Sequence, residues 1–196
     1  MKYILAGTNR PGSRTIVIAN IIKQLFKDEG EAVEIIDLCD VGLDQIAGFE
    51  YTENLPPKMR LAVDKINSAD GLFVVCPEYN GSMPGALKYF MDHWKYPESF
   101  EFRPVAFVGL GGMFGGLRPV EHLQAIFGFR NAFIYPERIF IQNVWTHLKD
   151  GKLEDAKLFA LMRTQVQGFR AFVAALSGAK LDANSRQKAR ASASSV

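Results

Sequence analysis

Short apolar runs alternate along this chain with stretches in which apolar residues recur every three or four positions. A continuous apolar run, such as residues 71–76, is typical of a parallel strand buried on both faces. Pro136 interrupts the last run, which indicates a late strand or a strand at the edge of the sheet. The predicted strands are residues 3–6, 32–38, 71–76, 103–109 and 132–141.

The stretches between these runs have the apolar spacing of amphipathic helices. The first begins near Ile16 and closes at Gly30, and the strongest period runs from Leu158 to Leu176. The others cover residues 59–66, 87–94 and 120–127, whereas residues 41–57 are irregular and polar. This alternation predicts an α/β fold with a doubly wound parallel sheet of five strands and helices on both faces.

Three loops rich in glycine, proline and polar residues each follow a predicted strand. They begin after Ala6, Cys76 and Gly109. In doubly wound sheets, ligands bind beyond the carboxyl ends of the strands, where the strand order reverses. We therefore expect the three loops to meet at one edge and to form the ligand site.

The first of these loops leads directly into a helix. Free backbone N–H groups and the positive end of the helix favour an anion at this point. Arginines and hydroxyl groups add charge and hydrogen-bond donors, so we interpret the loop as a phosphate site. The alternative is a plain strand–helix turn of small residues. The arginines and hydroxyl-bearing residues of the loop are Thr8, Arg10, Ser13, Arg14 and Thr15.

Two well-known phosphate loops do not match this stretch. Gly7 and Gly12 have Walker A spacing, but Ser13 and Arg14 follow where that loop needs a lysine. A dinucleotide fingerprint requires a second glycine where this chain has Asn9. A nucleoside triphosphatase and a dinucleotide site are therefore disfavoured. A loop for one terminal phosphate, as in a mononucleotide cofactor, remains.

Composition narrows the class of protein. With 196 residues, 48% of them hydrophobic, the chain suits one domain with a sizeable core. A net charge of +2 is too small to indicate nucleic acid or a membrane surface as a partner. No apolar stretch is long enough to span a bilayer, and the first residues lack a secretion signal.

The cysteines, the histidines and the last residues of the chain show no pattern of a catalytic or metal site. Cys39 and Cys76 match no metal or redox spacing and are expected to be buried free thiols in a reducing cytoplasm. The three histidines, at positions 93, 122 and 147, are expected at the surface, and we predict no metal site. Residues 181–196 lack apolar periodicity, so we predict a folded domain over residues 1–180 and a disordered tail after it.

The second loop reads Pro-Glu-Tyr-Asn-Gly-Ser-Met-Pro-Gly-Ala-Leu-Lys from Pro77 to Lys88. It resembles the P-E-Y-N-x-S-x-P-G-x-L-K motif of the NADPH-dependent FMN reductases, a flavodoxin-like family. The first loop is similar to the family's phosphate loop, G-[ST]-x-R-x-x-S-x-[NT]. Gly111-Gly112-Met113-Phe114-Gly115-Gly116 with Arg118 is similar to its third, glycine-rich loop. The resemblance covers about residues 1–176.

The resemblance implies a flavodoxin-like fold and a set of residues that bind FMN. The phosphate would lie on Thr8, Arg10, Ser13 and Thr15. The flavin ring would lie along Pro77, Glu78, Tyr79, Asn80, Gly81, Gly111 and Gly112. Tyr79 has an alternative role as a loop anchor, and Glu78 as a surface acid. This chain departs from the family at Met113 and Phe114, where small polar residues are frequent.

The resemblance also implies an activity. Hydride passes from NADPH through flavin N5 to a small acceptor such as free flavin or a quinone, with two-step kinetics and no catalytic side chain. The alternatives are an electron-carrier flavodoxin, which the charge of +2 disfavours, and a non-catalytic flavin-binding regulator. A homodimer or homotetramer is implied, and the aromatic segment 94–102 is either core or a subunit interface beside the partner's flavin.

Overall fold

The computed structural model describes residues 1–45 and 54–193. Five strands form one parallel sheet in the order β2-β1-β3-β4-β5. The strands are β1 (Lys2–Ala6), β2 (Val33–Asp37), β3 (Gly71–Pro77), β4 (Pro104–Leu110) and β5 (Phe133–Ile141). The predicted doubly wound α/β fold is therefore confirmed, with β5 at the edge as Pro136 indicated.

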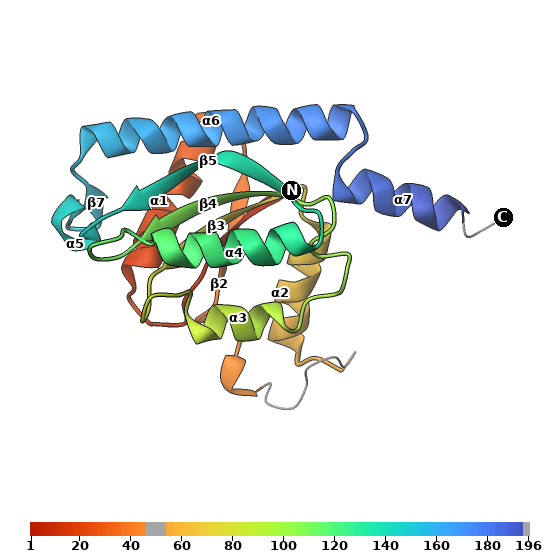
Figure 1. Cartoon of the computed structure of the whole chain (residues 1–196), viewed down its shortest axis with the longest axis horizontal. Coiled ribbons are helices and arrows are strands. Elements are labelled where there is room, and N and C mark those ends of the chain that lie inside the picture. Colours follow the sequence, from red (N-terminus) through yellow and green to blue (C-terminus); the bar gives the residue numbers. More distant parts are fainter. Residues whose placement is uncertain (46–53, 194–196) are drawn as a thin grey trace.

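Helices cover both faces of the sheet (Figure 1). Alternate residues of β3 explain why: Leu72 and Val74 point into one core, while Phe73 and Val75 point into the other. The first core is closed by α2 (Pro57–Ser68), α3 (Gly85–Met91) and α4 (Leu117–Phe129). The second is closed by α1 (Arg14–Asp28) and α6 (Ala156–Gly178).

Shorter elements complete the chain. They are the 3-10 turn η1 (Leu43–Gln45), the helix α5 (Val144–His147) and the hairpin of β6 (Leu148–Lys149) and β7 (Lys152–Leu153). Part of the stretch predicted as irregular, residues 46–53, lies outside the described residues. No helix among the described residues is long and apolar enough to cross a membrane.

A bulge shifts the register between β4 and β5. Val105 pairs with Ile134, but Phe107 pairs with Arg138, so extra residues around Pro136 leave the ladder locally unpaired. Buried Gln165 on α6 donates to the carbonyl oxygens of Phe107 (3.0 Å) and Glu137 (2.9 Å). This side chain satisfies backbone groups that the bulge would otherwise leave without a partner.

The expectation of a disordered tail is wrong for residues 183–193, which form helix α7 (Ala183–Ala193). Asp182 accepts from the backbone N–H of Ser185 at 3.1 Å and so caps the helix. The Ala183 N–H donates to the Phe102 carbonyl, and the guanidinium of Arg186 lies 3.9 Å from the Phe102 ring centroid. Polar and cation–π contacts hold this helix, which explains why apolar periodicity did not predict it.

Arg103 is the buried polar centre of this end of the molecule. Its guanidinium donates to the carbonyl oxygens of Asn67 (2.7 Å), Glu98 (3.1 Å) and Ala69 and to Oδ1 of Asn184 (3.0 Å). Burial lowers the pKa of Arg103 to about 10, so the group remains charged at neutral pH. It links α2, the segment before β4, and α7.

Arg103→Met is expected to lower the free energy of unfolding by about 3 kcal/mol or more, because three carbonyl oxygens would lose a buried donor. Urea denaturation followed by circular dichroism measures the effect. Arg138→Met is the matched control, since Arg138 is exposed and donates to a side chain, Oε1 of Gln124. Equal unfolding midpoints for the two variants would contradict the role assigned to Arg103.

Candidate functional site

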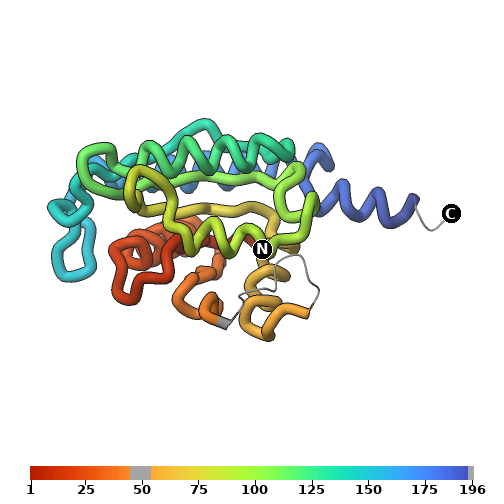
Figure 2. Tube along the Cα trace, turned by 60° about the horizontal axis from the view of Figure 1, so that its bottom comes forward, coloured from red at the N-terminus to blue at the C-terminus, as the bar shows by residue number. Residues whose placement is uncertain are grey.

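The three loops expected to form a site follow β1, β3 and β4, which are consecutive neighbours in the sheet. Because these strands are parallel, their carboxyl ends share one edge. Figure 2 shows the loops at the same end of the molecule, opposite α7. Backbone bonds join the strand ends, from Gly7 N–H to the Val75 carbonyl (2.8 Å) and from Glu78 N–H to the Leu110 carbonyl (2.9 Å).

The first loop ends at Ser13, which caps α1. Its hydroxyl accepts from the backbone N–H of Ile16 at 3.3 Å. Thr8, Ser13 and Thr15 are buried, whereas Arg10 is exposed. The first N–H groups of a helix lack acceptors within the helix, and the exposed cation Arg10 lies four residues before the start of α1. This donor set suits a phosphate dianion.

The second loop is a tight turn. Tyr79 and Ser82 exchange both backbone hydrogen bonds, at 2.9 and 3.1 Å, across Asn80 and Gly81. Asn80 (φ 52°) and Gly81 (φ 75°) both have positive φ, as a two-residue turn of this type requires. The turn therefore presents its backbone in one fixed conformation at the strand end, directly after buried Pro77.

Thr8 and Tyr79 connect the first two loops. The Thr8 hydroxyl donates to the Tyr79 hydroxyl at 3.1 Å, and the backbone N–H of Arg10 donates to the Thr8 oxygen at 3.3 Å. Tyr79 is half-buried, so its ring combines an anchored hydroxyl with a partly open face. The two roles considered for Tyr79, loop anchor and flat surface, are compatible in this geometry.

Glu78 connects the second loop to the third. Its Oε2 accepts from the backbone N–H of Gly116 at 3.2 Å, and its Oε1 lies 3.4 Å from Nη1 of Arg118. A Cβ on Gly111 would lie 3.2 Å from the Glu78 Cβ. The carboxylate is thus committed to contacts between the loops, which the interpretation of Glu78 as a surface acid does not explain.

The third loop turns back sharply onto β4. Gly116 has φ 84°, and a Cβ there would lie 2.4 Å from the Leu110 nitrogen. A Cβ on Gly109 would lie 2.5 Å from the Gly116 oxygen, so neither position has room for a side chain. The sequence motif contained Gly116, but its spacing did not reveal this close approach. Gly112 lies against Trp145, whose ring carbon would be 3.5 Å from a Cβ.

Two other expectations about residues require correction. His93 is buried rather than at the surface, since its Nδ1 bonds the Tyr89 carbonyl at 2.8 Å. Cys39 is exposed rather than buried, because it lies in the turn after β2. Partial burial and the charges of Asp37 and Asp40 raise the pKa of its thiol. Cys76 is buried as expected, and burial raises the pKa of its thiol too.

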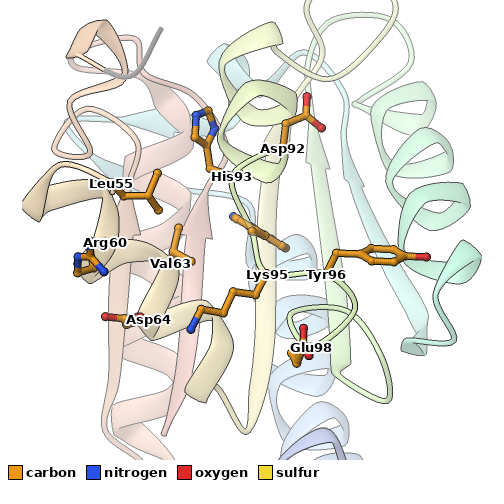
Figure 3. A pocket seen from close by; sticks show the side chains of 10 residues that line it. Leu55, Arg60, Val63, Asp64, Asp92, His93, Lys95, Tyr96 and Glu98 are labelled. Atoms are coloured by element: carbon orange, nitrogen blue, oxygen red, sulfur yellow. The ribbon is translucent and has the colours of Figure 1, made fainter. Parts of the chain in front are cut away.

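The aromatic segment 94–102 is partly core. Trp94 and Phe100 are buried and pack against Phe127, with ring centroids 6.0 and 5.4 Å away. A cavity of about 590 Å³ lies between α2 and residues 92–98 (Figure 3). None of the predicted site residues lines this cavity. Its lining residues are Leu55, Arg60, Val63, Asp64, Asp92, His93, Trp94, Lys95, Tyr96 and Glu98.

The loops and their order agree with a known family. The model of the NADPH-dependent FMN reductases matches residues 3–146, which include all three loops. The chain belongs to this family. It is therefore an oxidoreductase that uses FMN and NADPH, rather than the electron carrier or the regulator that the sequence left as alternatives.

Similar proteins agree with this assignment. The chain is 33% identical over 156 residues to an NADPH azoreductase of Bacillus sp. (strain OY1-2), covering 79% of this chain and 83% of that protein. It is 26% identical over 167 residues to an FMN-dependent NADPH-azoreductase of Staphylococcus saprophyticus, covering 84% and 86%.

Solved structures show the same fold. The flavoenzyme FerB of Paracoccus denitrificans superposes with a TM-score of 0.68 at 20% identity, covering 88% of this chain and 96% of that one. A flavodoxin of Fusobacterium nucleatum bound to flavin mononucleotide superposes with a TM-score of 0.53 at 12% identity, covering 87% and 96%. The flavodoxin-like architecture predicted from the motifs is thereby confirmed.

Gly116→Ala is expected to lower the free energy of unfolding of the apoprotein by about 2 kcal/mol or more, because of steric overlap and positive φ. Thermal unfolding measures it. Gly85→Ala is the control, since a Cβ there meets nothing within 4 Å. Gly85 is the first residue of α3, so alanine at this position should be neutral or slightly stabilising. Comparable destabilisation by Gly116→Ala and Gly85→Ala would contradict this prediction, because it would show that the third loop can shift to make room for a side chain.

Proposed function

We propose that the first loop holds the FMN phosphate through Thr8, Arg10, Ser13 and Thr15. The capped N-terminus of α1 and the exposed guanidinium of Arg10 support this assignment. A phosphate dianion would receive charge-assisted hydrogen bonds from both sources. Because the Thr8 hydroxyl also bonds the Tyr79 hydroxyl, Thr8 would connect the part of the site that holds the phosphate to the part that holds the flavin ring.

The flavin ring is proposed to lie along Pro77, Glu78, Tyr79, Asn80 and Gly81. The tight turn supports this placement, because its fixed peptide groups suit the donors and acceptors of a pyrimidine edge. Backbone at Gly111 and Gly112 would approach the ring from the third loop, where no Cβ intervenes. Glu78 would act by holding the two loops together rather than by touching the reacting atoms.

The proposed reaction moves two electrons and a proton from NADPH to a small acceptor. When bound along the residues named above, FMN would supply the hydride chemistry through its N5 atom, so the redox chemistry would belong to the cofactor. The chain itself binds the phosphate, orients the ring and leaves one face open to NADPH and the acceptor in turn. The acceptors proposed are free flavin, a quinone or a similar compound. Two relatives named as azoreductases extend this range to azo compounds.

The observation that carries the proposal is that every predicted site residue lies within residues 3–146, which the family model matches. We further propose that residues 1–180 form the FMN-binding unit and that the protein works as a homodimer or homotetramer. A cytoplasmic location is proposed because Cys39 and Cys76 are free thiols, which a reducing compartment preserves.

Arg10→Ala is expected to weaken FMN binding by about 10- to 100-fold, because a charge-assisted contact to the phosphate is lost. Quenching of flavin fluorescence on titration of the apoprotein measures the affinity. Lys23→Ala removes an exposed cation farther along α1 and should leave the affinity unchanged. Equal affinity of the Arg10 variant and the wild type would remove Arg10 from the phosphate site.

Two-step kinetics are expected for the complete reaction. Double-reciprocal plots of the initial rate against the acceptor concentration should give parallel lines at several fixed NADPH concentrations, because one open face serves both substrates. NADPH alone should bleach the yellow absorbance of the holoenzyme under anaerobic conditions. Intersecting lines together with an unbleached holoenzyme would refute alternate use of the same face.

A further inference from the structure

Large apolar side chains are exposed beside the proposed flavin site. Met113 is 75% exposed and Phe114 is 41% exposed, both in the third loop, and Trp145 packs beside Gly112. Single exposed apolar residues are ordinary, but a group of them at a ligand-binding edge marks a contact surface. These side chains form what we call the rim of the third loop.

Hydrogen bonds from the backbone and from one side chain fix the main chain that carries Met113 and Phe114. Nε2 of Gln142 donates to the Met113 carbonyl at 3.0 Å, and the Leu117 N–H donates to the Phe114 carbonyl at 3.0 Å. The Gly115 N–H donates to the Gly112 carbonyl at 3.1 Å. A fixed main chain limits the conformational entropy that is lost when a flat molecule settles on these side chains.

Arg118 adds a cation to this surface. Its guanidinium carbon lies 4.1 Å from the centroid of the Phe114 ring, within the range of a cation–π contact. The arginine side chain is 48% exposed, whereas its ion-pair partner Glu78 is 11% exposed. The carboxylate therefore lies beneath the guanidinium, and the positive group faces the solvent.

Arg118 has hydrogen-bonding capacity left over. Within the part of the chain that the structure describes, its one polar contact is to Oε1 of Glu78 at 3.4 Å. A guanidinium has five N–H donors in a planar fork that suits carboxylate and sulfonate groups. Glu78 also accepts from Gly116, so it fixes the arginine at the junction of the second and third loops.

We infer that Arg118 is a specificity-determining residue that selects acceptors carrying an anionic substituent on a flat aromatic ring. The ring would rest against Phe114 and Met113, and the anionic group would accept hydrogen bonds from the guanidinium N–H groups that Glu78 leaves free. The inference rests on the proposed function, because it places an acceptor at the open face of the flavin. It concerns one charge on the rim and does not depend on the order of the kinetic steps.

The inference can be tested without turnover by measuring the equilibrium binding of two redox-inert aromatic compounds. Naphthalenesulfonate and naphthalenesulfonamide have nearly the same shape and differ in charge. Isothermal titration calorimetry on FMN-loaded wild type and Arg118→Gln should show about tenfold weaker sulfonate binding in the variant, close to 1.4 kcal/mol. The preference for sulfonate over sulfonamide should fall by the same factor.

Arg130→Gln is the matched control. Arg130 caps the other end of α4 and also lies over an aromatic ring, 4.6 Å from the centroid of Tyr96. The 13-residue helix is about 20 Å long, more than a Debye length at physiological salt. Loss of this charge should leave the preference for sulfonate unchanged. Arg118→Lys keeps a charge at the rim and should retain part of the preference.

Steady-state kinetics supply the second readout. With saturating NADPH, the ratio of kcat/KM for a sulfonated naphthoquinone to that for its uncharged parent should fall about tenfold in Arg118→Gln. The ratio should stay at the wild-type value in Arg130→Gln. If no acceptor is reduced by the wild type, the proposed function fails, while the inert pair still tests the charge at Arg118.

Three outcomes would overturn the inference. Equal weakening of sulfonate and sulfonamide would make Arg118 a structural residue. A rise in the KM for NADPH with an unchanged acceptor ratio would assign the guanidinium to the nucleotide instead. A similar loss of preference in Arg130→Gln would show that the overall charge of the protein, rather than a local contact, attracts the anion.

Discussion

The close approach of the third loop to the end of β4 determines the form of the whole site. Gly116 lies so near the backbone of Leu110 that no side chain fits at that position. This contact turns the chain directly from β4 into α4 and places the Gly116 N–H where Glu78 accepts it. The second and third loops thus become one unit, because a single carboxylate bonds the backbone of one loop from the other.

The fixed register of β3 and β4 keeps the contact between Gly116 and Leu110 in place. β3 and β4 are buried on both faces, so a shift of one residue in register would move their apolar side chains to the wrong core. At the opposite end of β4, Arg103 joins α2, the preceding segment and α7 through backbone carbonyl groups and Asn184. The buried Arg103 and the third loop therefore lie at opposite ends of β4.

The sequence predicted most of what depends on local pattern. The strands were predicted nearly to the residue. For β3 and β4 this is because parallel strands buried on both faces are continuous apolar runs. Three loops following neighbouring strands were enough to predict one shared edge. Helix α7 was missed because polar contacts from Arg103 and Phe102 hold it, and such contacts between distant residues leave no periodic signal. Cys39 and His93 were misplaced for the same reason, since burial depends on tertiary packing.

Within the site, the sequence identified Glu78, but the partners of its carboxylate could not be deduced. They depend on how β3 and β4 align and on the sharp turn at Gly116, neither of which a motif encodes. In the proposed site, backbone groups and the polar side chains of the first loop would hold the cofactor in the same way whatever the acceptor. Discrimination among acceptors would then come from the few side chains at its rim, where Arg118 is 48% exposed and pairs with the largely buried carboxylate of Glu78. That division would separate cofactor binding, which the first two loops and Arg10 serve, from substrate choice, which the rim serves.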